Sequence, residues 1–78
     1  MPDDVQQALL WDMLDSARAI QRYLERTNRE AFLANPEKQD AVLRRFEIIG
    51  EAASRVTPET QALYPHIPFR AMRGMRNI

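Results

Sequence analysis

Apolar residues recur at a helical spacing in the first third of the chain. Their steps of 3, 4, 3 and 4 residues place them on one face of a helix. Asp4, with Gln7 three residues later, has the spacing of a reciprocal N-terminal cap. The pattern predicts a helix of about 20 to 24 residues that begins at this cap. Its apolar face consists of Leu10, Met13, Ala17, Ile20 and Leu24, widened by Leu9, Leu14 and Tyr23.

The same spacing returns in the second half of the chain. Asn35 and Pro36 have the types expected of the N-cap and the first residue of a second long helix. Gly50 stands in the middle of this helix, where a glycine costs about 1 kcal/mol relative to alanine. We therefore expect the two long helices to lie antiparallel and to approach closely at Gly50. The positions that repeat along the second helix are Val42, Arg45, Ile49, Ala52 and Val56.

Prolines divide the remainder of the chain. Thr57 and Pro58 end the second helix and begin a short one that runs through Leu63. A last helix starts near Pro68 and runs to Ile78 without a residue that would end it. The sequence thus predicts an all-α fold, an antiparallel helical bundle of two long helices and several short ones. Residues 1–78 are expected to form a single domain that is incomplete at its C-terminus.

Composition excludes several kinds of chemistry. The chain has no cysteine, one histidine and two glycines. A thiol nucleophile, a cysteine zinc site, a multi-histidine metal centre and a glycine-rich phosphate loop are therefore excluded, and we expect no metal or other cofactor. No apolar run approaches the ~18 residues of a membrane span. Asp3 and Asp4 stand where a signal peptide carries positive charge, so a cytoplasmic protein without membrane contact is expected.

Basic residues are concentrated near the end of the sequence. The formal net charge is +0, but the last thirteen residues carry Arg70, Arg73 and Arg76 and no acidic residue. At 100° per residue, Arg76 falls beside the apolar face that begins with Phe69. An arginine in this position pairs either with a carboxylate, such as that of Glu51, or with an anionic ligand. Both interpretations are open from the residues alone.

Other side chains that could carry chemistry have structural interpretations. Ser16 and Ser54 lie inside expected helices, so we do not expect either to pair with His66 as nucleophile and base. Glu47 and Glu51 lie four residues apart and are expected to form an ion-paired face with neighbouring arginines. These arginines are Arg44, Arg45 and Arg55, and the aromatic residues expected in the core are Trp11, Tyr23, Phe32, Phe46, Tyr64 and Phe69.

Three segments of the chain resemble one known family. Residues 11–15, followed by residues 19–20, resemble its first helix, and residues 45–53 resemble its second, with Gly50-Glu51-Ala52 as the most specific part. Residues 67–78 resemble the segment that leads into the signature of the HepT-like proteins, helical ribonuclease toxins of the HEPN superfamily. That signature is an arginine, a polar residue, three variable residues and a histidine, often followed two positions later by a tyrosine. Arg76 and Asn77 fill its first two places, and the histidine would fall three positions beyond Ile78.

The resemblance implies a metal-independent cleavage of RNA. In such a reaction a ribose 2′-hydroxyl attacks the adjacent phosphate, a histidine moves protons, and Arg76 stabilises the charge that builds on the phosphoryl oxygens. Asn77 would orient the histidine or bind the phosphate, and Arg70 and Arg73 would contact RNA. The family also implies a cognate nucleotidyltransferase antitoxin that transfers AMP to the signature tyrosine. It further implies a homodimer, which the small size of the chain favours.

Two other functions remain open beside that of a ribonuclease toxin lacking its C-terminal end. One is a complete, catalytically inactive helical module that dimerises or binds a nucleotidyltransferase partner. The other is a substrate-binding helical domain of a nucleotidyltransferase. The residues of the sequence do not separate these functions, because each requires the same helices.

Overall fold

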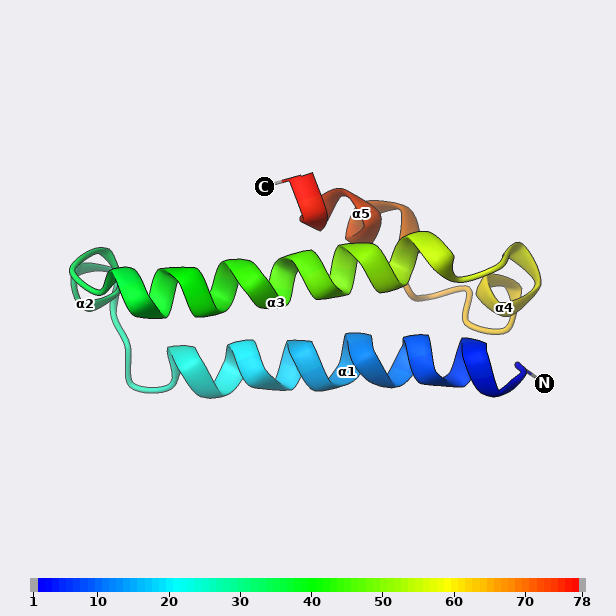
Figure 1. The fold of residues 1–78 in the computed structure, drawn as a ribbon, viewed down its shortest axis with the longest axis horizontal. Coiled ribbons are helices and arrows are strands. Elements are labelled where there is room, and N and C mark those ends of the chain that lie inside the picture. Colours follow the sequence, from blue (N-terminus) through cyan, green and yellow to red (C-terminus); the bar gives the residue numbers. More distant parts are fainter. Residues whose placement is uncertain (1, 78) are drawn as a thin grey trace.

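The computed structural model describes residues 2–77, which form helices and connecting turns without a strand. Two long helices, α1 (Asp4–Leu24) and α3 (Pro36–Arg55), lie side by side and antiparallel (Figure 1). Two short helices, α2 (Arg29–Leu33) and α4 (Pro58–Ala62), lie at opposite ends of this pair. Helix α5 (Phe69–Arg73) and the 3-10 helix η1 (Gly74–Asn77) then return along α3 (Figure 1). The expected all-α antiparallel bundle is confirmed. None of the described helices is long and apolar enough to cross a membrane.

The N-terminal caps of α3 and α4 lie where the sequence places them. The Asn35 side chain accepts a hydrogen bond from the Lys38 backbone N–H at 3.0 Å, and the Thr57 hydroxyl accepts one from the Thr60 N–H at 3.3 Å. A proline occupies the first turn of each helix, where its missing N–H leaves no bond unmade.

The cap of α1 differs by one residue from the expectation. The helix begins at Asp4, but the capping side chain is that of Asp3, whose backbone is extended and whose carboxylate accepts from the Gln6 N–H at 2.8 Å. Asp4 instead lies in the first turn, where its negative charge favours the positive end of the helix dipole. The expected pairing of Asp4 with Gln7 is therefore wrong.

The last helix is also not the continuous α-helix that we expected. Helix α5 ends at Arg73, and Gly74 is its C-terminal cap. The Gly74 N–H donates to the carbonyl of Ala71, three residues earlier, so the chain tightens into the 3-10 helix η1. Ile78, to which the expected helix ran, lies outside the described residues.

Helix α1 packs on α3 through a different face from the one that the apolar pattern indicates. Met13 is common to the expected and the observed faces, and Leu9, which the pattern gave only as a flank, is buried. Ala17 and Leu24, by contrast, are exposed. Small side chains are among the most deeply buried residues of both helices, since Ala19 and Ala53 are each 0% exposed. The buried residues of α1 are Gln6, Leu9, Met13, Ser16 and Ala19.

A buried glutamine fixes the start of α1 to the end of α3. The Gln6 amide nitrogen donates to the Arg55 carbonyl at 3.2 Å, and its amide oxygen accepts from the Thr57 N–H at 2.9 Å. These bonds satisfy two backbone groups at the end of α3, where a helix leaves its last carbonyls without partners. A polar residue therefore belongs to the buried face, although its hydropathy gives no indication of this.

The main hydrophobic cluster lies at the end of the α1–α3 pair that α5 covers. Phe69, the first residue of α5, is 3% exposed and joins this cluster, so it fixes α5 to both long helices. The other buried members are Leu9, Met13, Ala52, Ala53 and Val56.

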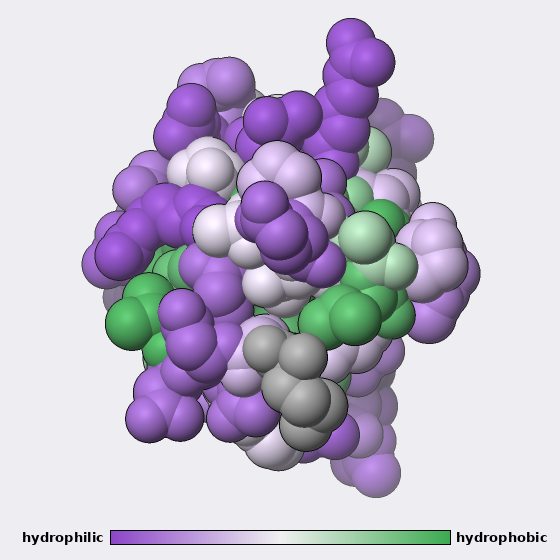
Figure 2. Space-filling view, turned by 90° about the vertical axis from the view of Figure 1, so that its right-hand side faces the viewer, coloured by the Kyte–Doolittle hydropathy of each residue, from purple (hydrophilic) through white to green (hydrophobic). Residues whose placement is uncertain are grey.

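Of the six aromatic residues expected in the core, only Phe69 is buried, and one lies on the surface. The half-buried ones are Tyr23, Phe32, Phe46 and Tyr64. Trp11 is 58% exposed and, with Leu14, lines an open apolar groove between α1 and the segment that leads into α5. The rotation of α1 explains this position, since it turns Leu10, Trp11 and Leu14 away from α3. Seen from the end of the molecule that carries α4, the periphery is largely hydrophilic and hydrophobic atoms show between the polar side chains (Figure 2).

Candidate functional site

The backbone of η1 lies directly against α3 at Gly50. A Cβ atom added to Gly50 would collide with the Arg76 backbone nitrogen and would lie 2.7 Å from the Arg76 Cβ. The sequence correctly predicts a close approach at this glycine, but the approaching backbone is that of η1 and not that of α1. Gly50 follows Ile49, which packs among the buried residues of α3, and one helical step of about 100° turns position 50 toward η1.

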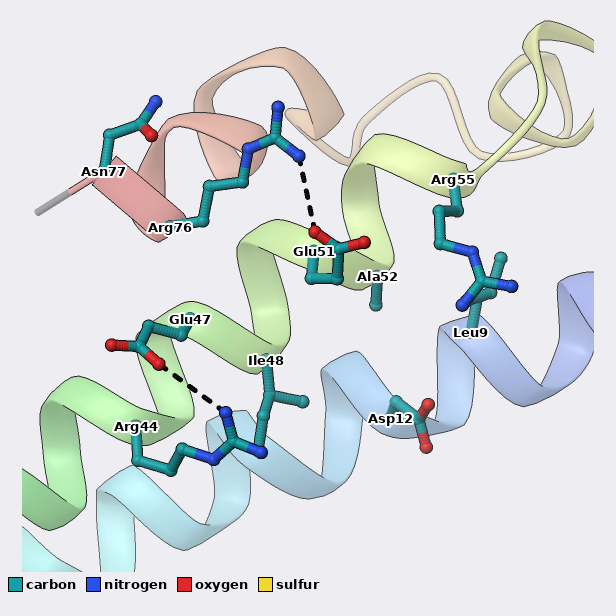
Figure 3. A pocket seen from close by; sticks show the side chains of 10 residues that line it. All are labelled: Leu9, Asp12, Arg44, Glu47, Ile48, Glu51, Ala52, Arg55, Arg76 and Asn77. Atoms are coloured by element: carbon teal, nitrogen blue, oxygen red, sulfur yellow. Dashed lines mark hydrogen bonds and ion pairs between the residues drawn. The ribbon is translucent and has the colours of Figure 1, made fainter.

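The guanidinium of Arg76 pairs with the next residue of α3. Its Nη1 atom donates to Glu51 Oε2 at 3.4 Å, and the two side chains are 47% and 63% exposed (Figure 3). The ion pair that we considered from the sequence is therefore present. A half-exposed pair of this kind contributes about 0–1 kcal/mol, so it does not prevent an anion from reaching the arginine. Ion pairing and anion binding are compatible roles for Arg76.

Arg76 and Asn77 line an open pocket of about 480 Å³ on α3, and residues of α1 form its other wall. Within it, the Asn77 amide points away from α3, whereas Arg55 points from α3 toward α1 (Figure 3). The pocket is strongly charged but balanced, because its lining contains three arginines and three carboxylates. They are Arg44, Arg55 and Arg76, and Asp12, Glu47 and Glu51.

The expected ion-paired face of α3 is only partly formed. Arg44 pairs with Glu47 at 3.5 Å, with the two side chains 71% and 48% exposed. Arg45 instead donates from Nε to the Tyr23 hydroxyl at 3.3 Å. Within residues 2–77, the structure gives the Arg55 guanidinium no ion-pair partner. Arg55 is thus a second charged donor in the lining of the same pocket.

The structure separates the four residues that the sequence assigned to the site. Arg76 and Asn77 lie together at the pocket, whereas Arg70 and Arg73 are exposed on α5 and are not part of its lining. Arg44 and Arg55 line the pocket in their place, although the sequence indicates for them only a role as ion-pair partners. A signal for them exists, since positions 44, 48, 51 and 55 have steps of 4, 3 and 4 and therefore share one face of α3.

The described residues contain no group of three or more histidine, cysteine, aspartate or glutamate side chains that could hold a metal ion. The pocket instead offers planar guanidinium groups, which bind the oxygens of phosphates and carboxylates through paired N–H donors. Three carboxylates lie among these guanidinium groups, so the lining carries both signs of charge.

These features define the class of the protein as a small all-α protein with an arginine-bearing polar pocket on its second long helix. A family model described as "Ribonuclease HepT-like" matches residues 13–78. The chain belongs to this family.

Archaeal proteins are similar to the chain over most of its length. "Putative RNase MJ1216" of Methanocaldococcus jannaschii is 35% identical over 77 residues, which are 99% of this chain and 64% of the relative. "Putative RNase MJ0125" of the same organism is also 35% identical over 77 residues, which are 66% of its length. "Probable ribonuclease HepT" of Thermococcus cleftensis is 35% identical over 68 residues, which are 87% of this chain and 62% of the relative. The chain thus spans somewhat less than two thirds of the length of these relatives. No solved structure matches it.

Proposed function

We propose that this chain provides the phosphate-binding half of a metal-independent endoribonuclease site. One observation carries the proposal: Arg76 and Asn77, the first two residues of the arginine–histidine signature, line an open pocket with two further arginines in a chain of the HepT-like family. The arrangement matches what RNA cleavage needs, because a phosphate must be held by fixed donors while negative charge builds on its oxygens.

The proposed reaction uses the RNA itself as the nucleophile. The ribose 2′-oxygen forms a bond to the adjacent phosphorus, and the bond from that phosphorus to the 5′-oxygen of the next nucleotide breaks. A histidine, which the signature places three positions beyond Ile78, takes the 2′-hydroxyl proton and supplies one to the departing 5′-oxygen. Arg76 stabilises the phosphoryl oxygens, and Asn77 orients the histidine or binds the phosphate.

The remaining arginines bind RNA in this proposal without reading its sequence. Arg44 and Arg55 line the pocket, and Arg70 and Arg73 add exposed positive charges on α5. Contacts of this kind neutralise backbone phosphates and release counterions, so the affinity depends strongly on salt.

Mutation of Arg76 tests the catalytic part of the proposal. A chain extended past Ile78 to supply the signature histidine should cleave RNA, and the 78-residue chain should not. In the extended chain, Arg76→Ala should lower the rate about 10² to 10³-fold, because a fixed charge donor is lost from the transition state. The matched variant Arg70→Ala should weaken binding and leave the rate at saturating RNA unchanged.

Equal rates for the wild type and Arg76→Ala would falsify the role given to Arg76. Binding without cleavage by the extended chain would favour the inactive helical module instead.

We further propose that the protein is a homodimer and the toxin of a toxin–antitoxin pair with a nucleotidyltransferase antitoxin. Shape and surface support dimerisation, since the structure is an elongated helix pair of 43 × 20 × 20 Å with a large hydrophobic residue, Trp11, on its surface. Sedimentation equilibrium at micromolar concentration tests for the dimer, and a monomer with a cooperative melting transition would count against it.

The antitoxin part of the proposal has a separate test. The antitoxin would transfer AMP from ATP to the signature tyrosine, and the added phosphate would compete with RNA for Arg76. Intact masses after incubation with antitoxin and ATP should show one added AMP on an extended chain that carries the tyrosine and none on the 78-residue chain. AMP on the 78-residue chain, or none on the extended chain that carries the tyrosine, would exclude this form of regulation.

A further inference from the structure

We propose that Gly50 and Glu51 are positioning residues for Arg76. Gly50 lets the Arg76 backbone lie against α3, and Glu51 fixes the direction in which the guanidinium points. The inference deepens the proposed function and rests on it for the role of Arg76 as a phosphate ligand. It gives the Gly50-Glu51 pair a specific purpose, which is to place one side chain at the pocket.

The steric part of the inference depends on what meets a side chain at position 50. The three atoms nearest to an added Cβ all belong to Arg76: its backbone nitrogen, its Cβ at 2.7 Å and its Cα at 3.0 Å. Backbone atoms cannot move aside as the tip of a flexible side chain can, so any Cβ here displaces η1 as a unit. Alanine also has a higher helix propensity than glycine, which means that α3 itself does not require Gly50.

The electrostatic part depends on the residue that follows. Glu51 lies one helical step beyond Gly50, and its carboxylate meets the Arg76 guanidinium at 3.4 Å (Figure 3). The contact uses one N–H donor of Arg76, and a guanidinium has five, so the others remain free for a phosphate. Glu51 therefore restricts the orientation of the arginine without occupying all of its donors.

Both contacts connect Arg76 to the most regular element of the fold. Helix η1 has four residues and no buried side chain of its own, and the nearest buried anchor is Phe69, seven residues before Arg76. A side chain on such a short element needs support from a rigid neighbour to be held in one geometry. Two consecutive residues of α3, a helix of 20 residues, supply that support.

A pair of glycine variants tests the steric contact. Gly50→Ala should displace Arg76, whereas Gly74→Ala adds a Cβ with no atom within 4 Å and serves as the matched control. The readout is the affinity for a short, fluorescein-labelled 2′-O-methyl oligoribonucleotide, which cannot be cleaved because its 2′-oxygen is blocked. Gly50→Ala should weaken binding about tenfold, the effect of losing one charge-assisted contact, and Gly74→Ala should leave it unchanged. Both variants should keep the far-UV circular dichroism of the wild type.

A double-mutant cycle separates displacement of Arg76 from a general loss of structure. Arg76→Ala should weaken binding about tenfold in the wild-type background and have no further effect in the Gly50→Ala background. Arg70→Ala should weaken binding by the same factor in both backgrounds. If Arg76→Ala is equally harmful in both, Gly50 does not position Arg76 and the inference is wrong, while the proposed function stands. If Arg76→Ala has no effect in the wild type, the proposed function itself is wrong.

A pair of glutamate variants tests the electrostatic contact. The Nε–Hε signal of Arg76 in an NMR spectrum, assigned by its absence in Arg76→Lys, reports the surroundings of the guanidinium. Glu51→Gln should shift this signal, and Glu47→Gln, which removes the carboxylate paired with Arg44, should not. An unchanged Arg76 signal in Glu51→Gln would show that Glu51 does not orient the arginine.

Discussion

The two sides of α3 are built on different principles. Toward α1, the helix presents buried side chains, such as Ala52 and Ala53, that belong to one cluster with side chains of its neighbour. Toward η1, it presents Gly50 and Glu51, which contact a backbone and a charged group. Apolar burial on the first side stabilises the fold at about 25 cal/mol per Å². The exposed ion pair on the second side contributes little to stability.

This difference separates stability from site geometry within one helix. Changes on the α1 side should alter the free energy of unfolding, and changes on the η1 side should alter RNA binding with little effect on unfolding. Phe69 is the exception, because it is the buried anchor of the segment that carries Arg76 and also a member of the main hydrophobic cluster.

Removal of the Phe69 side chain should therefore have the largest effect and should affect both properties. Phe69→Ala should lower the free energy of unfolding by about 3–5 kcal/mol, since it leaves a cavity among residues of α1 and α3. Urea denaturation measures this loss, and the control Leu33→Ala, at a position 62% exposed, should change stability by less than about 0.5 kcal/mol. If RNA binding survives Phe69→Ala under conditions in which the chain is folded, Phe69 is not the anchor of η1.

An enlarged side chain on the α1 side should have the next largest effect. Ala53 is 0% exposed and belongs to the main hydrophobic cluster with residues of α1, so Ala53→Leu should cost about 3 kcal/mol by overpacking. Thermal unfolding measures the loss of stability. The control is Ala71→Leu, at an exposed position of α5. A stable Ala53→Leu variant would mean that the contact between the helices is loose.

The same contrast shows how far sequence reasoning reaches. The buried face of α3 was predicted well, because Val42, Ile49, Ala52 and Val56 are apolar, repeat regularly and have one long neighbour on which to pack. The buried face of α1 is predicted less well. Apolar residues occupy more than half of the circumference of that helix, and hydropathy does not indicate which of them face α3. Its rotation depends on small side chains such as Ser16 and on hydrogen bonds of Gln6, which are tertiary features.

The candidate site was predictable to a similar degree. Helical periodicity places Arg76 at the edge of an apolar face and leaves open a pair with a carboxylate, such as that of Glu51, or with an anionic ligand. The structure contains the pair with Glu51. The prediction that α1 approaches Gly50 is wrong, since the backbone of η1 does so. A glycine indicates a close approach without indicating which backbone approaches. The sequence does not indicate Arg55 as a site residue, because helical spacing places it four residues after Glu51 as an ion-pair partner. In the fold its guanidinium turns toward α1 instead (Figure 3).

Loss of the Gln6 side chain should have a moderate effect on the α1 side alone. Gln6→Ala removes two hydrogen bonds to backbone groups at the end of α3 and should cost about 2 kcal/mol. The neighbouring Gln7 is exposed, so Gln7→Ala is a matched control that should leave stability nearly unchanged. Urea denaturation compares the two. Equal free energies of unfolding for Gln6→Ala and Gln7→Ala would show that water replaces both hydrogen bonds of Gln6 without loss of stability.

Loss of Arg44 should have the smallest effect on stability and should act mainly on RNA binding at the pocket. Arg44 is 71% exposed and pairs with a half-exposed Glu47, so Arg44→Ala should change the free energy of unfolding by less than about 0.5 kcal/mol. Because Arg44 lines the pocket, its removal should still weaken RNA binding and lower the salt dependence of the affinity by about one phosphate contact. Fluorescence anisotropy at several salt concentrations measures the slope of affinity against salt.

Arg18, which is exposed on α1 and absent from the pocket lining, provides the control Arg18→Ala. If the two variants reduce the slope equally, binding follows net charge alone, and the pocket is not where RNA binds.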